Sequence, residues 1–177
     1  LKGMTGIYVS VSVNGGGDFI QPVKIAENVS AINKNPGVAI SRGGEIYVVW
    51  NILSSDEANG SIFFSKSEDL GATWSPPEQI TFGMQMEILP VFAFDEHDKL
   101  HLFYTAYKDR IFNLFHSVRE EGKFNKPEEV ARFDGNVKGA FFPAVKFYKN
   151  HAVVLWQTKE ESYIDHLYFV KSEDYGA

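Results

Sequence analysis

The chain has 177 residues, of which 44% are hydrophobic and 15% aromatic, a composition that excludes a disordered chain and favours strands over helices. Its net charge of −6 argues against a duplex nucleic-acid partner, because phosphate binding needs an excess of Lys and Arg on one face. It contains no cysteine and no apolar run near the roughly 20 residues of a membrane span, so disulfides, thiolate metal sites and a membrane span are not predicted.

Four groups of short strand-like runs follow one another along the chain. Residues 6–25 contain two runs, residues 36–80 and 90–130 contain four each, and residues 143–173 contain three. The runs alternate apolar and polar positions and are bounded by turn residues, with no segment of helical period between them. This order predicts an all-β fold.

The groups are copies of one unit. Pro36, Pro90 and Pro143 open the last three groups at spacings of 54 and 53 residues. The second run of each of these groups ends in an aromatic residue, which predicts a core position: Trp50, Tyr104 and Trp156. Four strands in about 53 residues are typical of a β-propeller blade. A β-sandwich is the alternative, but it needs no repeat of fixed length.

We therefore predict one partial β-propeller domain over residues 1–177, built of four-stranded antiparallel blades. Its parts are blade remnants in 1–30, a blade in 31–83, a blade in 84–133 and an incomplete blade in 134–177. The last part has three predicted strands, so its outermost strand is an open edge. Two origins remain possible: a fragment of a longer protein, which we favour, or two chains that combine. The isolated chain is expected to self-associate through its open edges, with a homodimer suspected.

One connection between runs carries polar residues at alternate positions. Its motif consists of Ser67, Asp69, Gly71, Thr73 and Trp74. A carboxylate at this position can accept N–H bonds from its own turn, glycine allows a positive φ, and the tryptophan can anchor the loop. Weaker copies of the motif contain Ser12, Asn14 and Gly16, and Ser172, Asp174 and Gly176. The motif predicts a structural turn, with a catalytic Asp69 as the alternative.

This motif resembles the Asp-box (BNR repeat) of the sialidase-like (neuraminidase) superfamily, to which the neighbouring strand pattern is also similar. The resemblance covers nearly the whole chain. It implies a six-bladed type of β-propeller, incomplete in this chain, with the box on the face opposite the active site. It also implies a carbohydrate-related function, a glycan or glycoconjugate as ligand, and a secreted or periplasmic location.

In a propeller, ligands bind where the second strand of a blade turns into the third and where one blade connects to the next. The residues predicted to face a ligand are Glu87, Tyr107, Arg110, Lys138, Glu160, Glu161, Tyr163 and Asp165. A role as solvated loop residues is the alternative for each of them. No catalytic residue is predicted.

The resemblance implies that an active sialidase holds its substrate carboxylate with three arginines and uses a tyrosine nucleophile with a Glu and an Asp. Arg42 and Arg119 are predicted on the opposite face, which leaves Arg110 and Arg132 near a ligand. The chain is therefore expected to lack catalytic competence. The alternatives are a fragment of an exo-sialidase or related glycoside hydrolase whose catalytic residues lie in missing blades, and a non-enzymatic protein-binding propeller. No cofactor or metal site is predicted, because the five histidines show no metal-ligand spacing.

Overall fold

The computed structural model describes residues 5–28, 30–80, 82–131, 137–160 and 165–172, and every regular element in them is a β-strand. The strands are β1 (Thr5–Val9), β2 (Val23–Asn28), β3 (Ala31–Ile40), β4 (Ile46–Ser54), β5 (Gly60–Ser67), β6 (Glu78–Ile80), β7 (Gln85–Phe94), β8 (Leu100–Lys108), β9 (Ile111–Glu120), β10 (Lys123–Phe124), β11 (Glu128–Ala131), β12 (Val137–Tyr148), β13 (His151–Glu160) and β14 (Asp165–Ser172). The predicted all-β fold is confirmed.

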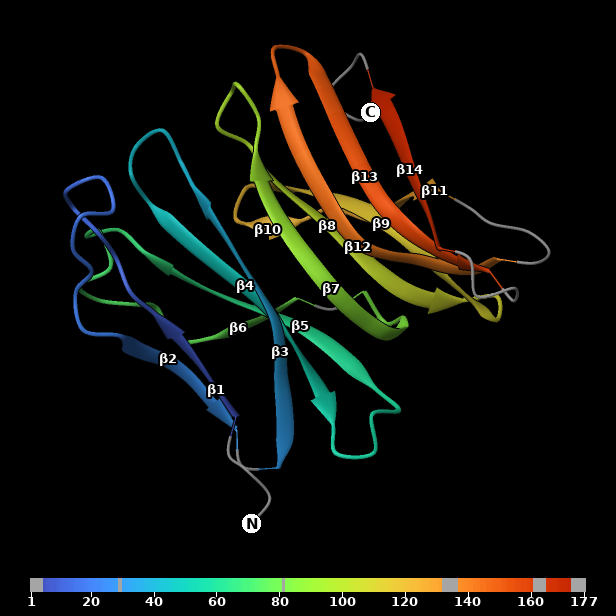
Figure 1. Ribbon diagram of the computed structural model, residues 1–177, viewed down its shortest axis with the longest axis horizontal. Helices are drawn as coiled ribbons and strands as arrows, with labels where there is room; N and C mark the ends of the chain where they lie inside the picture. Colours follow the sequence, from blue (N-terminus) through green and yellow to red (C-terminus); the bar gives the residue numbers. More distant parts are fainter. Residues whose placement is uncertain (1–4, 29, 81, 132–136, 161–164, 173–177) are drawn as a thin grey trace.

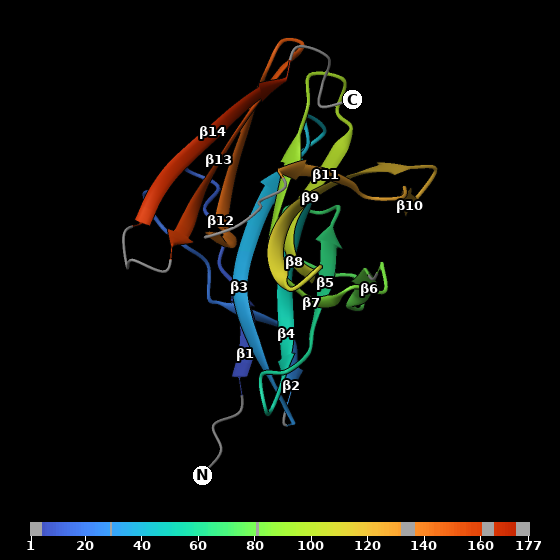
Figure 2. The same ribbon diagram turned by 90° about the vertical axis from the view of Figure 1, so that its right-hand side faces the viewer.

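The strands form successive antiparallel sheets (Figure 1). Sheet 1 has the order β3-β4-β5-β6, and sheet 2 has β7-β8-β9, with β11 and the short β10 both paired to β9. Sheet 3 has the order β12-β13-β14, and β1 pairs with β2 at the N-terminal end. The inner strands β3, β7 and β12 lie side by side, and the remaining strands extend outward from them (Figure 2). A single parallel pair, Gly139 with Phe112, connects sheets 2 and 3.

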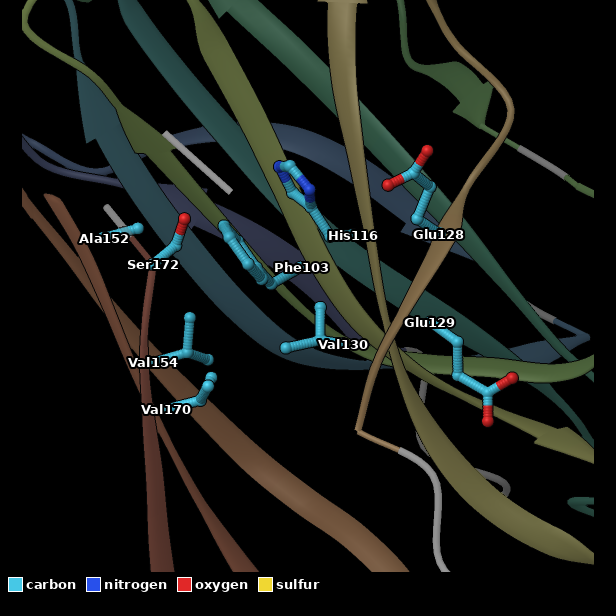
Figure 3. Close-up of a pocket in the computed structure, with 9 residues that line it drawn as sticks. All are labelled: Phe103, His116, Glu128, Glu129, Val130, Ala152, Val154, Val170 and Ser172. Atoms are coloured by element: carbon cyan, nitrogen blue, oxygen red, sulfur yellow. The ribbon is translucent and has the colours of Figure 1, made fainter. Parts of the chain in front are cut away.

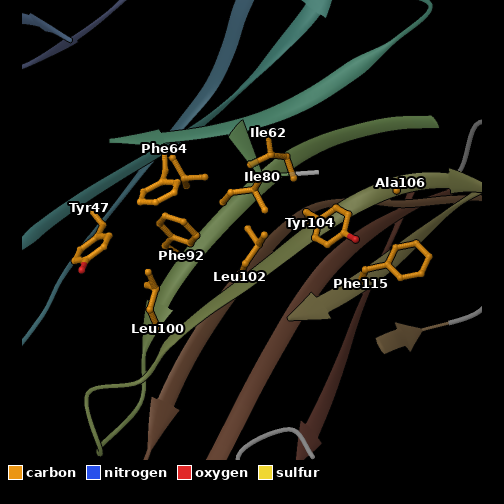
Figure 4. Close-up of a cluster of buried hydrophobic side chains, with 11 residues drawn as sticks. Tyr47, Ile62, Phe64, Ile80, Phe92, Leu100, Leu102, Tyr104, Ala106 and Phe115 are labelled. Atoms are coloured by element: carbon orange, nitrogen blue, oxygen red, sulfur yellow. The ribbon is translucent and has the colours of Figure 1, made fainter. Parts of the chain in front are cut away.

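Apolar side chains fill the spaces between consecutive sheets. One cluster joins sheets 1 and 2 and includes Phe64, Phe92 and Tyr104 (Figure 4). A second cluster joins sheets 2 and 3 around Phe103 and Trp156, and a third joins β1 and β2 to sheet 1. The three recurring aromatics are all buried: Trp50, Tyr104 and Trp156. Each sheet is therefore stabilised by its neighbours rather than by a core of its own.

The middle strands β4 and β8 continue beyond the aromatic residues at which the sequence pattern ended them. The polar residue after each aromatic is buried and bonds to the next sheet. Asn51 Oδ1 accepts the Leu89 N–H at 3.2 Å, and Thr105 Oγ1 donates to the Ala140 carbonyl at 2.9 Å. Polar residues at these positions predicted loops. The two side chains can be buried because they form hydrogen bonds with backbone groups of the neighbouring inner strand.

Each inner strand has a β-bulge at its proline, and β7 and β12 each have a second register shift nearer their N-terminal ends. The pairing with the middle strand shifts between Lys34 and Gly37, between Ile88 and Val91, and between Phe141 and Ala144. The residue before each proline has a positive φ: 55° at Asn35, 53° at Leu89 and 54° at Phe142. A bulge bends its strand, so the repeated prolines mark a bend at the same level of every inner strand.

The connection from β5 to β6 is a loop held by its own side chains. Asp69 Oδ1 accepts the Thr73 N–H at 2.8 Å and Oδ2 accepts the Thr73 hydroxyl at 2.6 Å, while Ser67 Oγ accepts the Gly71 N–H at 2.8 Å. Trp74 Nε1 donates to the Gly71 carbonyl at 3.1 Å. Gly71 has a φ of 89°, and a Cβ there would lie 2.6 Å from Val11 Cγ2, so both the backbone and the packing require glycine.

The N-terminal copy of this loop repeats the same bonds. Ser12 Oγ accepts the Gly16 N–H and Asn14 Oδ1 accepts the Asp18 N–H, both at 2.9 Å. In the C-terminal copy, Ser172 ends β14, whereas Asp174 and Gly176 lie outside the described residues. The two loops that the structure describes therefore use their carboxylate or amide oxygen to close the turn.

These bonds hold the pKa of Asp69 at about 2, chiefly through the Thr73 hydroxyl, then through the Thr73 N–H and the Ser67 hydroxyl. We expect Thr73→Val to raise the pKa of Asp69 toward its usual 3.8, because the hydroxyl is lost and the backbone bond is kept. An NMR titration of the side-chain carboxyl carbons measures this change. Asp56, whose pKa is lowered mainly by the Ser54 hydroxyl, serves as the internal control and should not respond. An unchanged Asp69 titration would contradict the assignment of the shift to Thr73.

A buried chain of hydrogen bonds links two histidines inside sheet 2. His101 Nδ1 lies 2.8 Å from His116 Nε2, and His101 Nε2 lies 3.4 Å from Asp95 Oδ2. The two rings are stacked with an interplanar angle of 7°. Burial lowers the pKa of His101 below its ordinary 6.5, so the neutral ring is the form that fits the fold.

This shift makes stability depend on pH. The unfolded chain protonates His101 near its ordinary pKa while the folded chain does not, so the unfolded state binds more protons and the free energy of unfolding falls as the pH drops below about 6.5. We expect His101→Gln to reduce this loss between about pH 8 and about pH 5.5, because glutamine does not titrate. Urea unfolding of both proteins at both values measures the difference. Equal losses would contradict the burial effect.

Candidate functional site

A cavity of about 260 Å³ lies where the bends of the three inner strands meet. Its walls consist of the bulge and the residues that follow it in each strand: Asn35, Pro36, Gly37, Leu89, Pro90, Val91, Phe142 and Pro143. The one polar side chain among these lining residues, Asn35, donates to Asn51 Oδ1 at 2.8 Å. The cavity is therefore mainly apolar, with backbone groups as its other polar atoms, and it suits the apolar face of a ligand better than a charged group.

Glu87 lies on β7 just before this bulge, but its side chain is in the interior, with 1% of the residue exposed. Its Oε1 accepts the N–H groups of Phe82 and Met84 at 2.9 and 3.1 Å. The carboxylate thereby closes the connection from sheet 1 to sheet 2. Burial raises the pKa of the nearby Tyr104 above its ordinary 10, and the negative charge of Glu87 adds to this effect.

Tyr107 and Arg110 lie together at the turn from β8 to β9. The ring of Tyr107 is tilted against that of Phe112, with centroids 5.1 Å apart. Arg110 is exposed at the turn and has a φ of 71°. Gln85 of β7 pairs with Tyr107, so this turn lies at the same end of sheet 2 as the connection that Glu87 closes. The structure thus brings three of the predicted residues to one end of one sheet.

The other predicted residues belong to sheet 3. Lys138 lies in β12, Glu160 ends β13 and Asp165 begins β14. The pairs of Val137 with Glu160 and of Lys159 with Asp165 place these three backbone positions at one end of the sheet. The structure does not describe their side chains. Glu161 and Tyr163 lie outside the described residues.

Two further arginines lie at the opposite end of the sheets. Arg42 is in the turn between β3 and β4, where its backbone N–H donates to Asp98 Oδ1 at 2.9 Å. Arg119 lies near the end of β9, with its guanidinium 5.6 Å from the ring centroid of Phe64. Arg132 lies outside the described residues. Among the arginines in the described ranges, Arg110 is accordingly the one at the same end of sheet 2 as Glu87 and Tyr107.

The described residues include no group of three or more His, Asp or Glu side chains arranged to hold a metal ion. The part of the chain that the structure covers also contains no helix capable of crossing a membrane. The polar residues that the sequence pattern missed are Asn51 and Thr105. Their equivalent positions could have been recognised from the sequence, because each directly follows one of the recurring aromatics.

No protein-family model matches the chain, and neither does any curated protein. Solved structures do match it. They include a Hadza microbial sialidase, Hz136, with 13% identity, a TM-score of 0.70, and coverage of 97% of this chain and 39% of the other. The GH93 α-L-arabinofuranosidase of Fusarium graminearum with arabinobiose has 17% identity and a TM-score of 0.70, and the match covers 96% of this chain and 55% of the other. NanB with Optactamide has 8% identity and a TM-score of 0.73, and the match covers 97% of this chain and 45% of the other.

At such low sequence identities, the structural similarity shows a shared fold and nothing more. The chain spans about half or less of the length of these proteins, while nearly all of it aligns. Together with the antiparallel sheets packed side by side around their inner strands, this result agrees with the resemblance inferred from the sequence motifs. The chain has the fold of the sialidase-like β-propellers and forms an incomplete part of such a propeller.

Proposed function

We propose that this chain is a carbohydrate-related propeller module that does not catalyse glycoside hydrolysis by itself. The names of its structural neighbours, a sialidase and an arabinofuranosidase, support the carbohydrate part of the proposal. The position of Glu87 carries the second part. Among the described residues, Glu87 is the buried carboxylate at the end of sheet 2 where Tyr107 and Arg110 also lie. Two backbone N–H groups already donate to its Oε1.

A carboxylate that takes part in glycoside hydrolysis as an acid, base or nucleophile must lie within hydrogen-bond reach of the substrate. A carboxylate that closes a turn inside the protein does not meet this requirement. The described residues instead offer the exposed Arg110 at the turn from β8 to β9 and an apolar cavity at the bends of the inner strands. A guanidinium suits the charge of an anionic sugar, and an apolar cavity suits its apolar face.

Activity and binding assays on the intact chain test this proposal. Fluorogenic α-sialosides and α-L-arabinofuranosides should give no turnover above the blank, whereas a glycan array should show binding. Arg110→Ala should weaken that binding, and Arg42→Ala, at the opposite end of the sheets, is the matched control. Turnover would overturn the non-catalytic assignment and favour a glycosidase. Neither turnover nor glycan binding would favour the protein-binding alternative.

We also propose that the isolated chain associates with a second copy through its open edges, as a homodimer. The strand β14 is the last of sheet 3, and a large apolar surface is exposed there: Leu155 is 42% exposed, Leu167 79% and Phe169 72%. Such a surface favours association. Light scattering at micromolar concentration should give the mass of a dimer, and the mass of a monomer would contradict the proposal.

A further inference from the structure

Two buried histidines lie at the contact between sheets 2 and 3. His101 is 2% exposed, and its ring centroid lies 4.5 Å from that of Phe147 in sheet 3. His116 is 6% exposed and stacks on Phe103, with the ring centroids 4.5 Å apart. Phe103 and Phe147 both belong to the apolar cluster that joins the two sheets. The two imidazoles are therefore part of the packing between sheets 2 and 3.

The hydrogen bonds of the pair determine where its hydrogens lie. The carboxylate oxygen Asp95 Oδ2 can only accept, so the hydrogen of the 3.4 Å contact belongs to His101 Nε2. In a neutral ring His101 Nδ1 is then an acceptor, and His116 Nε2 donates to it across the 2.8 Å contact. If both rings were protonated, the two facing nitrogens would each carry a hydrogen. The geometry therefore allows the pair at most one additional proton.

A cavity of about 220 Å³ gives water a way into the contact between the two sheets (Figure 3). His116 and Phe103 line it from sheet 2, and Ala152, Val154 and Val170 line it from sheet 3. A water molecule needs only about 10–15 Å³ of such a cavity, so there is room for several. Water can thus enter beside one ring of the pair.

The connection from β7 to β8 compensates a positive charge on the pair only in part. Asp95 Oδ1 already accepts the backbone N–H groups of His97 and Lys99, both at 2.8 Å. Burial lowers the pKa of His101 below its ordinary 6.5, the hydrogen bond and charge of Asp95 act in the opposite direction, and the positive charge of Lys99 adds to the lowering. Burial has the largest effect, so the neutral pair is the form that suits the closed contact.

The other strands around the pair place acids on one side and uncharged walls on the other. On β11, Glu128 pairs with His116, and both Glu128 and Glu129 line the cavity. The Glu129 carboxylate also forms an ion pair with Lys108 at 3.5 Å. The residues that line the cavity from sheet 3 are uncharged: Ala152, Val154, Val170 and Ser172. The charged or titratable residues next to Phe147 and to these wall residues along their strands are Lys146, His151 and Lys171.

We propose that the His101–His116 pair is a pH-sensitive switch, which holds sheets 2 and 3 together while both rings are neutral and opens the contact between them when the pair takes up a proton. A charged ring would lie among the aromatic side chains of the cluster, where a charge is costly unless water reaches it. Opening lets water hydrate the charged ring, and the cavity beside His116 is where this water enters. The inference does not depend on glycan binding.

The opening is expected to be local. The cluster that joins sheets 1 and 2 contains no histidine among its described members, so that contact should respond little to pH. A histidine that is neutral in the closed form, and has an ordinary pKa of about 6.5 in the opened form, shifts the opening equilibrium about tenfold between pH 7.5 and about pH 5.5. The opened form binds more protons, so opening increases as the pH falls.

Hydrogen exchange of the intact chain at about pH 7.5 and about pH 5.5 tests the proposal, with rates corrected for the intrinsic pH dependence of amide exchange. The amides of β12 and β13 should lose protection by about tenfold or more on acidification, and those of β4 and β5 should lose much less. In addition, ¹⁵N NMR at the higher pH should show a hydrogen on Nε2 of both rings, and the signals of the two rings should change together during a titration.

His116→Gln removes one titrating ring and keeps an amide donor for His101 Nδ1, so the loss of protection in β12 and β13 should become several-fold smaller. His97→Gln, at an exposed histidine of the β7–β8 connection, is the matched control and should leave the loss unchanged. An equal loss in all strands, no loss between the two pH values, or independent titration of the two rings would each contradict the proposal. If His116→Gln does not fold, the exchange and NMR measurements on the unaltered chain still decide the question.

Discussion

Replacing Glu87 with alanine is expected to lower the free energy of unfolding by about 2–4 kcal/mol, because each buried donor left without a partner costs about 1–3 kcal/mol. The two donors are the N–H groups of Phe82 and Met84, which Glu87 Oε1 accepts at 2.9 and 3.1 Å. The same substitution should lower the pKa of Tyr104, since the negative charge nearby helps to raise it. Urea unfolding and a spectroscopic tyrosine titration measure the two effects.

Glu87→Gln is the matched variant. Its amide oxygen can still accept both N–H groups, so we expect it to retain more than half of the stability that alanine loses. If Glu87 instead contacts a ligand, as the sequence suggested, glutamine would leave stability unchanged and abolish glycan binding. Equal destabilisation by alanine and glutamine would show that the charge of Glu87, rather than its acceptor oxygen, is what stabilises the connection.

The second large effect is expected at the pair of residues that joins sheets 2 and 3. Gly139 has a φ of 135°, and a Cβ there would lie 2.5 Å from both the Cβ and the carbonyl oxygen of Phe112. Gly139→Ala combines an unfavourable backbone conformation with overpacking, each of which costs about 1–3 kcal/mol. We expect it to lower the free energy of unfolding by about 2–5 kcal/mol.

Gly122→Ala separates these two contributions. Gly122 has a φ of 82°, but a Cβ there would meet no atom within 4 Å. Only the backbone cost of about 1–2 kcal/mol therefore remains. Chemical denaturation of both variants gives the comparison, and equal losses at the two glycines would mean that the close approach of β12 to β9 adds no steric cost to the substitution.

Much of the fold could be predicted from the sequence because the repeat is present in the residues themselves. Prolines at spacings of 54 and 53 residues and the recurring aromatics predicted strands that the structure contains. The lengths of the middle strands were harder to predict. Asn51 and Thr105 were interpreted as the beginnings of loops, because polar residues after an aromatic usually mark an exposed turn. They are buried because the partners that satisfy them belong to another sheet, about 35 or more residues away in sequence.

The candidate site was less predictable for a related reason. The sequence predicted Glu87, Tyr107 and Arg110 to face a ligand from the connections between strands, and in the structure these residues lie at one end of sheet 2. The direction of a side chain, however, depends on which hydrogen-bond donors surround it. Glu87 turns inward because two backbone N–H groups of its own connection need an acceptor. No spacing rule contains that information.

The bulges at the prolines of the inner strands bear on how readily these strands could pair with other chains. The strands β3 and β7 are the terminal strands of their sheets on the inner side, so their free edges lie close to one another. Such edges tend to pair into continuous, flat sheets that lead to fibrils. Proline cannot donate a backbone hydrogen bond, and the bend before Pro36 and Pro90 interrupts the straight row of N–H and C=O groups that a growing fibril needs. The inner edges are thus kept apart by the backbone itself, whereas β14 has no proline anywhere along its length.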